Sequence, residues 1–237
     1  MLKEGERLDD LEYKGLKIIQ HPEGYCFTSD SVLISNLAKV KRTDRVADIG
    51  TGSGIIAILV AAKFTPKEVV GVEIQERLAD MASRSVEYNG LSDRVKIVCA
   101  PAQGVEKIIG NNFDVVISNP PYEKASEEKN EKTVAKTEIM LTVEETVGTA
   151  SALLRYGGLF YTVNKARRLT DVLCAMRNAK IEPKKLYLIQ PKKGKEIDVF
   201  IVEGKKGAKP SLLVPEPITV YEEDGSYGEI ARRLYNK

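Results

Sequence analysis

Asn119, Pro120, Pro121 and Tyr122 directly follow an apolar run, 113–118, that is typical of a buried strand. Proline has a fixed φ and no amide hydrogen, so two prolines in succession end the strand and stiffen the backbone after it. The asparagine amide oxygen and the first proline's carbonyl oxygen are hydrogen-bond acceptors. The segment could hold these two acceptors still at the end of a strand, or it could be no more than a stiff loop.

A glycine-rich turn is the second motif with chemical potential. Gly50, Gly52 and Gly54 alternate between a predicted strand and a predicted helix, where they permit positive φ and close approach of a ligand to the backbone. The first amides of the helix would offer hydrogen-bond donors. A dinucleotide fingerprint would have its third glycine at position 55, which is Ile55. The turn therefore indicates a cofactor other than NAD, unless it only packs strand on helix.

A carboxylate ends the next apolar strand along the chain, at Glu73. An acid in this place can accept hydrogen bonds from both hydroxyls of an adenosine ribose, and it would repel a 2′-phosphate. The alternative is a solvated carboxylate that caps the helix starting near Gln75. Together with the glycine turn, Glu73 favours a cofactor that contains adenosine.

The elements that must position these residues alternate along the chain, which predicts a Rossmann-like α/β fold with a mostly parallel sheet and helices on both faces. Ligands of such sheets bind outside the carboxyl ends of the strands. A hairpin of 16–20 with 25–28 and a helix at 31–39 precede this series. The predicted strands are 45–49, 68–73, 95–99, 113–118, 159–163, 185–189 and 197–202, and the predicted helices are 55–63, 75–89, 141–154 and 167–179.

The composition excludes several classes of protein. With 237 residues, 43% of them apolar, the chain is long enough for one large domain with a good core. Cys26, Cys99 and Cys174 are scattered and odd in number, and His21 is the single histidine, so we expect a reducing cytoplasmic setting and no metal site. No apolar run is long enough for a membrane span. A net charge of +2 means that a polyanion would need a local basic patch.

The order of the motifs resembles a known family. DIGTGSG at 48–54, VEI at 72–74 and NPPY at 119–122 are similar to class I S-adenosylmethionine-dependent methyltransferases of the branch that methylates amino or amide nitrogens. FTSDSVLISNLA at 27–38 and the C-terminal tail are similar to the bacterial family that makes N6-methyladenine in the anticodon loop of a valine tRNA. The resemblance implies seven strands in the order 3-2-1-4-5-7-6, with the seventh antiparallel. It also divides one compact unit into an N-terminal extension, 1–40, and a methyltransferase domain, 41–237.

The resemblance gives the NPPY residues their roles. The lone pair of an adenine amino group is delocalised into the ring, so the nitrogen must be activated by geometry. Asn119 and the Pro120 carbonyl would accept its two hydrogens, and Pro121 would hold that carbonyl in place. Tyr122 would stack on an extruded base. No general base is required before methyl transfer, because the amino proton becomes acidic once the methyl group is attached.

Further cofactor contacts are implied by the same resemblance. Thr28 and Asp30 match the family's N-terminal motif on the cofactor side, although Asp30 could instead cap the following helix. Asp48 could face the cofactor's ammonium group through water, or it could only brace the loop. Pro101 stands where relatives have an acid that reaches the adenine, so adenine recognition would rest on backbone groups near Ala100 or on Gln103.

The expected partner is RNA, most specifically tRNA. Lys192, Lys193 and Lys195 lie between the last two predicted strands and could contact phosphates, although a charged run is usually a solvated surface. Three alternatives remain open: methylation of guanine N2 in ribosomal RNA, methylation of glutamine N5 in a protein, and a nucleotide-binding or tRNA-binding module without catalysis. We expect a monomer.

Overall fold

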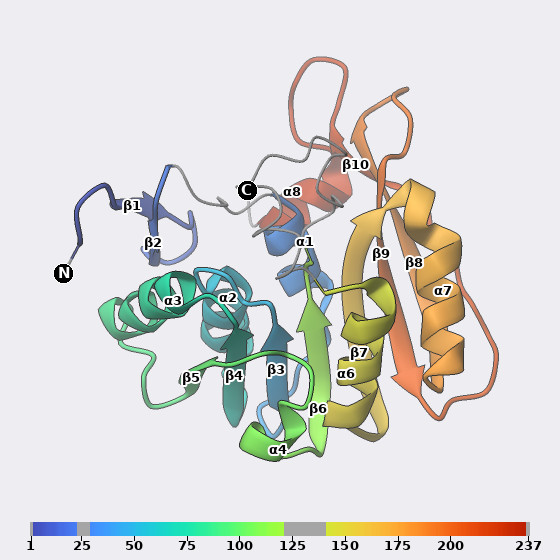
Figure 1. The fold of residues 1–237 in the computed structure, drawn as a ribbon. Helices are drawn as coiled ribbons and strands as arrows, with labels where there is room; N and C mark the ends of the chain where they lie inside the picture. Colours follow the sequence, from blue (N-terminus) through green and yellow to red (C-terminus); the bar gives the residue numbers. More distant parts are fainter. Residues whose placement is uncertain (1, 23–28, 121–140, 236–237) are drawn as a thin grey trace, which may run out of the picture.

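The computed structural model describes residues 2–22, 29–120 and 141–235. Their main sheet has eight strands: β3 (Arg45–Ile49), β4 (Glu68–Glu73), β5 (Val95–Cys99), β6 (Phe113–Ser118), β7 (Leu154–Lys165), β8 (Ile181–Lys192), β9 (Val199–Lys206) and β10 (Ile218–Tyr221). Their order is β10-β8-β9-β7-β6-β3-β4-β5. All neighbours are parallel except at β9, which is antiparallel to β7 and β8 and points the opposite way in Figure 1.

The implied strand order is confirmed, with one addition. Counted from β3, the first seven strands of the main sheet, β3 to β9, are arranged 3-2-1-4-5-7-6 with the seventh antiparallel. β10 extends the sheet as an eighth strand beside β8. Ile218 and Val220 of β10 are buried. The prediction of seven strands missed β10 because four residues with two buried positions have too short a pattern to stand out from a loop.

Helices cover both faces of the sheet, and two separate apolar clusters fill the two interfaces. One cluster includes residues of α1 (Ser29–Leu37), α2 (Ile55–Phe64), α3 (Glu76–Tyr88) and α8 (Glu229–Tyr235). The other includes residues of α6 (Val143–Leu153) and α7 (Leu169–Asn178), with the short α4 (Glu106–Ile109) beside α6. The central strands are therefore buried on both faces, which explains why they are continuous apolar runs.

The N-terminal hairpin contains a strand, β1 (Arg7–Asp10), that was not predicted from the sequence. β2 (Lys17–Gln20) pairs antiparallel with β1, which precedes it, whereas the expected partner, 25–28, lies outside the described residues. The missed signal is the stretch 11–16, which turns the chain between them. Leu11 and Ile18 join the apolar cluster that also contains Val46 of β3, so the hairpin packs on the same core as the main sheet.

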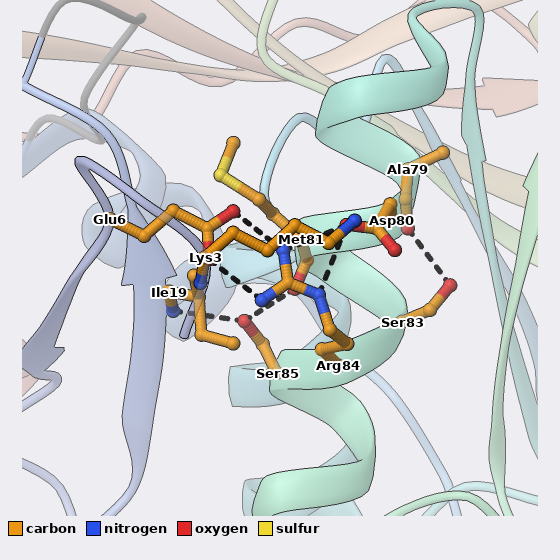
Figure 2. A network of polar contacts seen from close by, with 9 residues as sticks. All are labelled: Lys3, Glu6, Ile19, Ala79, Asp80, Met81, Ser83, Arg84 and Ser85. Carbon is orange, nitrogen blue, oxygen red and sulfur yellow. Dashed lines mark hydrogen bonds and ion pairs between the residues drawn. The ribbon is translucent and has the colours of Figure 1, made fainter. Parts of the chain in front are cut away.

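Polar contacts fasten the hairpin to α3. The Asn89 side chain pairs with the Lys17 backbone as a strand would: Oδ1 accepts from the Lys17 amide at 2.9 Å and Nδ2 donates to the Lys17 carbonyl at 2.6 Å. Ser85 Oγ accepts from the Ile19 amide at 2.9 Å, and Arg84 forks between Glu6 and Asp80 (Figure 2). The bonds from Asn89 and Ser85 satisfy backbone groups of β2 that the two-stranded sheet leaves unpaired.

Candidate active site

The candidate site lies where the strand order reverses, between β3 and β6. β3 has β4 on one side and β6 on the other, and both neighbours are parallel to it, so their carboxyl ends meet at one edge. Figure 1 shows the arrowheads of β3 and β6 pointing to that edge. Ser118 Oγ donates to the Ile49 carbonyl at 3.0 Å and links the ends of the two strands. This is the switch point at which α/β sheets bind ligands.

The glycine turn after β3 offers open space more than hydrogen-bond donors. Gly50 and Gly52 have φ of 71° and 58°, and a Cβ at either would meet nothing within 4 Å. Gly54, with φ of 95°, is different, because a Cβ there would lie 3.2 Å from Ala82 Cβ on α3. The amides of Gly50 and Gly54 donate to protein carbonyls. Gly50 and Gly52 thus leave room for a ligand, whereas Gly54 lets α2 pack closely on α3.

Glu73 is buried at the end of β4 and supports the glycine turn. Its Oε2 accepts from the Gly52 amide and its Oε1 from the Gln75 amide, both at 3.0 Å. The alternative of a solvated helix-capping carboxylate is wrong in its exposure, since only 6% of Glu73 is exposed. A carboxylate has about four acceptor positions, so these two bonds leave capacity for ribose hydroxyls.

Asp48 is fully buried one residue before the end of β3. Thr51 Oγ1 donates to its Oδ2 at 2.5 Å, while its Oδ1 has no hydrogen-bond partner. Burial raises the pKa of Asp48 to about 7; the Thr51 hydroxyl and the backbone amide of Ala57 oppose this shift, and the nearby Glu73 carboxylate adds to it. A buried carboxylate with an unpaired oxygen is costly unless a polar or cationic group faces it.

Asn119 lies directly after β6 and is almost fully buried. Its Nδ2 donates to Ser31 Oγ at 2.8 Å, and its Oδ1 has no partner. An unpaired buried acceptor is rare in folded proteins. The predicted role of Asn119, an acceptor for a target hydrogen, would use such an unpaired oxygen. Pro120 is half-buried beside it, and Pro121 and Tyr122 lie outside the described residues.

The other predicted cofactor contacts, at Thr28, Asp30, Ala100 and Gln103, stay predictions. Thr28 lies outside the described residues, and Asp30 is in the first turn of α1, which begins at Ser29, so Asp30 is not its N-cap. The Ala100 amide donates to the Glu73 carbonyl at 3.0 Å. Gln103 Nε2 donates to Glu145 Oε1 at 2.6 Å. The Ala100 amide and the Gln103 side chain therefore already have protein partners.

The basic residues expected to contact RNA lie at the same edge of the sheet as Asn119. β8 is parallel to β6, because β9 reverses direction between β7 and β8, and Lys192 ends β8. Lys192, Lys193 and Lys195 are exposed, and Lys193 Nζ is 3.9 Å from Glu222 Oε2. Figure 1 shows the turn after β8 at the edge toward which β6 points.

Sequence reasoning missed three residues of this edge. Thr51 binds Asp48, and Ser31 binds Asn119. Arg167 follows β7, the strand next to β6; it is exposed and makes no ion pair with any residue that the structure describes. The Ala-Arg-Arg run at 166–168 was a visible signal for the last of these, but the two hydroxyls had none, because serine and threonine in loops are common.

The acceptor groups of the site fit the cofactor that the resemblance implies. S-adenosylmethionine has ribose hydroxyls for the remaining acceptor positions of Glu73 and an ammonium group that suits the unpaired oxygen of Asp48. The open side of Gly50 and Gly52 leaves room for it. Over the three described ranges, no group of three or more His, Cys, Asp or Glu could hold a metal ion, and no helix is long and apolar enough to cross a bilayer.

Curated relatives have names that refer to methyl transfer. A tRNA1(Val) (adenine(37)-N6)-methyltransferase of Bacteroides thetaiotaomicron is 28% identical over 218 residues, which are 87% of this chain and 89% of that protein. A protein of the same name from Porphyromonas gingivalis is 35% identical over 130 residues. The match spans about half the length of that relative, 51%. A putative protein N5-glutamine methyltransferase of Methanocaldococcus jannaschii is 37% identical over 120 residues, 50% of this chain and 57% of that protein.

The fold and the family profile agree with these relatives. The crystal structure of a predicted O-methyltransferase from Agrobacterium tumefaciens superposes with a TM-score of 0.71 at 24% identity, covering 87% of this chain and 95% of that one, which supports the fold alone. Residues 27–179 match the profile of the methyltransferase small domain, and this match spans more than half of the 237 residues. The chain therefore belongs to the methyltransferase small domain family.

Proposed function

We propose that this protein transfers the methyl group of S-adenosylmethionine to the exocyclic N6 of an adenine in tRNA, in the anticodon loop of a valine tRNA. The family match supports methyl transfer, and the names of the Bacteroides and Porphyromonas relatives support the tRNA substrate. The observation that carries the proposal is the buried Asn119 Oδ1, which has no hydrogen-bond partner and lies at the switch point of the sheet.

The cofactor would be held by the ends of β3 and β4. When bound, S-adenosylmethionine supplies an electrophilic methyl group to the site. Glu73 accepts hydrogen bonds from the ribose hydroxyls while its bonds to the Gly52 and Gln75 amides keep the glycine turn in place. Asp48 offers its unpaired oxygen to the ammonium group of the cofactor. Thr28 and Asp30 stay predicted contacts.

The target nitrogen would be bound by acceptors alone. Asn119 Oδ1 and the Pro120 carbonyl accept the two amino hydrogens, so the nitrogen lone pair is turned out of the ring plane and made available. A preorganised acceptor needs no rearrangement during the reaction. No general base is needed before transfer, because the extra proton of the methylated nitrogen is acidic and leaves to water. Pro121 and Tyr122 are predicted to stiffen this loop and to stack on the base.

The RNA would be bound by basic residues along the same edge. Arg167 follows β7, between Asn119 on one side and the Lys192 and Lys195 turn on the other. Adjacent strands lie about 4.8 Å apart. β7 is next to β6, and β9 separates β7 from β8, so these cations stand along the edge at a spacing that a nucleic-acid backbone can contact. Lys193 contributes less, because Glu222 is close to it.

Methylation of a protein glutamine is the second candidate, since its amide nitrogen is also planar and the Methanocaldococcus relative is named for that activity. The purified chain should be incubated with radiolabelled S-adenosylmethionine and, separately, with tRNA, ribosomal RNA and protein from an organism that lacks the gene. We expect label in tRNA, recovered as N6-methyladenosine after digestion. Label in protein or in ribosomal guanine would favour the alternatives, and no label in any fraction would favour a binding module.

A further inference from the structure

The orientation of the Asn119 amide decides whether it can serve a target amino group. A side-chain amide has an acceptor oxygen on one branch and two donor hydrogens on the other. An amino group approaching the wrong branch would meet donors with its own donors and would be repelled. The proposed chemistry therefore needs something that selects one of the two orientations.

In the structure, one contact anchors the amide in the orientation that leaves its oxygen free. Asn119 Nδ2 donates to Ser31 Oγ at 2.8 Å, and because an amide NH₂ can only donate, the serine oxygen is the acceptor. The oxygen branch of the same amide points away from Ser31 and has no partner. Both residues are buried, with 3% of Ser31 and 9% of Asn119 exposed, so water is poorly placed to replace the serine.

Ser31 is rigidly placed for this task. It is the third residue of α1, and Leu33 and Ile34 of the same helix are fully buried in the core. The contact joins residues 88 positions apart, so it brings the N-terminal extension to the end of β6.

We propose that Ser31 is a positioning residue, which holds the Asn119 amide with its oxygen toward the target nitrogen. This inference rests on the proposed function for its consequence, although the contact itself does not depend on the substrate. Without the Ser31 hydroxyl, neither branch of the amide has a partner on α1. The amide then loses this anchor and moves within the site, and only part of the population is productive.

The test compares two buried serines of one helix. We expect Ser31→Ala to lower kcat for methylation of tRNA about tenfold, which corresponds to the loss of about 1.4 kcal/mol of transition-state stabilisation. KM for tRNA and the affinity for S-adenosylmethionine should stay within about twofold, because Ser31 is assigned to neither ligand. Ser35→Ala removes an equally buried hydroxyl that has no contact with Asn119, and it should leave kcat within about twofold.

A second readout follows the amide directly. The side-chain amide resonances of Asn119, assigned by their loss in Asn119→Ala, should shift and exchange faster with solvent in Ser31→Ala but not in Ser35→Ala. Unchanged resonances in Ser31→Ala, an unchanged kcat, or equal loss of kcat in the two serine variants would overturn the proposal. If the wild-type chain methylates no RNA, the proposed function fails, and the resonances still decide whether Ser31 orients Asn119.

Discussion

Two buried oxygen atoms identify the site at the scale of single residues. Among the residues that the structure describes, Asp48 Oδ1 and Asn119 Oδ1 are the buried side-chain polar atoms without a hydrogen-bond partner. They belong to the carboxyl ends of neighbouring strands, β3 and β6. Each unpaired group costs about 1–3 kcal/mol of stability. Two such costs at one edge are understandable if ligands supply the missing partners.

Asn119→Ala should abolish methyl transfer while binding of the methyl donor, S-adenosylmethionine, stays nearly intact. The amide oxygen is assigned to the target nitrogen, and Glu73 and Asp48 are assigned to the cofactor, so the two functions are separable. Turnover is measured with labelled S-adenosylmethionine and tRNA, and donor affinity by calorimetry. If donor affinity falls together with turnover, Asn119 supports the fold of the whole edge, and its assignment to the target is wrong.

Asp48 should make donor binding depend on pH. Burial raises its pKa to about 7, and a cationic ligand binds the ionised carboxylate better than the neutral acid. Donor affinity should therefore rise as the pH increases from about 6 to 7.5, below the range, about 7.7–8.0, in which an α-amino group loses its own proton. Calorimetry across this range checks the slope.

Asp48→Asn is the matched control for this pH dependence. The substitution keeps the shape and an acceptor for the Thr51 hydroxyl, but it removes the titrating group. We expect weaker donor binding that is flat with pH over the same range. An equal slope in the wild type and in Asp48→Asn would assign the pH dependence to another group and remove Asp48 from the cofactor site.

At the scale of elements, the attachment of the N-terminal hairpin to α3 depends on Arg84. Its guanidinium donates to both Glu6 oxygens, at 2.7 and 2.6 Å, and to Asp80 Oδ2 at 2.7 Å (Figure 2). The side chains of Glu6 and Arg84 are 4% and 15% exposed. The bidentate geometry and this burial make the pair stronger than an ordinary surface ion pair.

Arg84→Met should loosen the hairpin while keeping the apolar stem of the side chain in place. We expect unfolding free energy to fall by about 1.5–3 kcal/mol, the range for hydrogen bonds to charged groups, with faster proteolysis in residues 2–20. Lys3→Ala is the control, because its bond to Asp80 is exposed, and it should cost less than about 1 kcal/mol. Equal effects of the two variants would refute the special role of Arg84.

The same contact predicts the direction of an acid response. Arg84 holds the pKa of Glu6 and of Asp80 below the usual range of these carboxyls. A depressed pKa in the folded state contributes stability above the unfolded-state pKa, about 4, and this stability is lost as the pH falls through the folded-state value. Arg84→Met should therefore lose less stability than the wild type on acidification.

At the scale of the whole molecule, RNA affinity must come from the distribution of charge, since the net charge is only +2. Replacing Lys192 and Lys195 by Ser should flatten the slope of log affinity against log salt by about 1.4, and Arg167→Ser by about 0.7, at about 0.7 for each phosphate contact to a single strand. Lys193→Ser should change the slope less, because Glu222 lies 3.9 Å from its ammonium group. Affinity for tRNA is measured between about 50 and 200 mM salt.

The control for salt dependence is at the other end of the strands, where the parallel strands begin. Arg42 is exposed and precedes β3, so it lies near the amino ends of the parallel strands. Arg42→Ser should leave the slope unchanged. A flat slope for the wild type would exclude phosphate contacts as the source of affinity and would favour a protein substrate. Equal flattening by Arg42→Ser and Arg167→Ser would mean that only net charge matters.

Much of the fold could be predicted because the central strands have a local signature. The bounds of β3, β4, β5 and β6 coincide with the predicted runs. β3, β4 and β6 are buried along nearly their whole length, as expected for strands covered on both faces. β7, β8 and β9 extend beyond their apolar runs, because pairing continues into residues such as Lys192 and Lys206 that hydropathy assigns to loops. The expected partner of β2, 25–28, lies outside the described residues, and the partner β1 was not predicted, because the turn signal at 21–24 competes with the one at 11–16.

The sequence by itself determined the glycine turn, Glu73 and Asn119, because each follows its own apolar strand and parallel strands bring their carboxyl ends together. It also determined the family, through the order of these motifs. Only the tertiary structure decided which atoms are left unpaired, that Gly54 serves helix packing, and that Ser31 binds Asn119 across 88 residues. Periodicity reports the neighbours of a residue within a few positions, whereas these contacts depend on how distant elements pack.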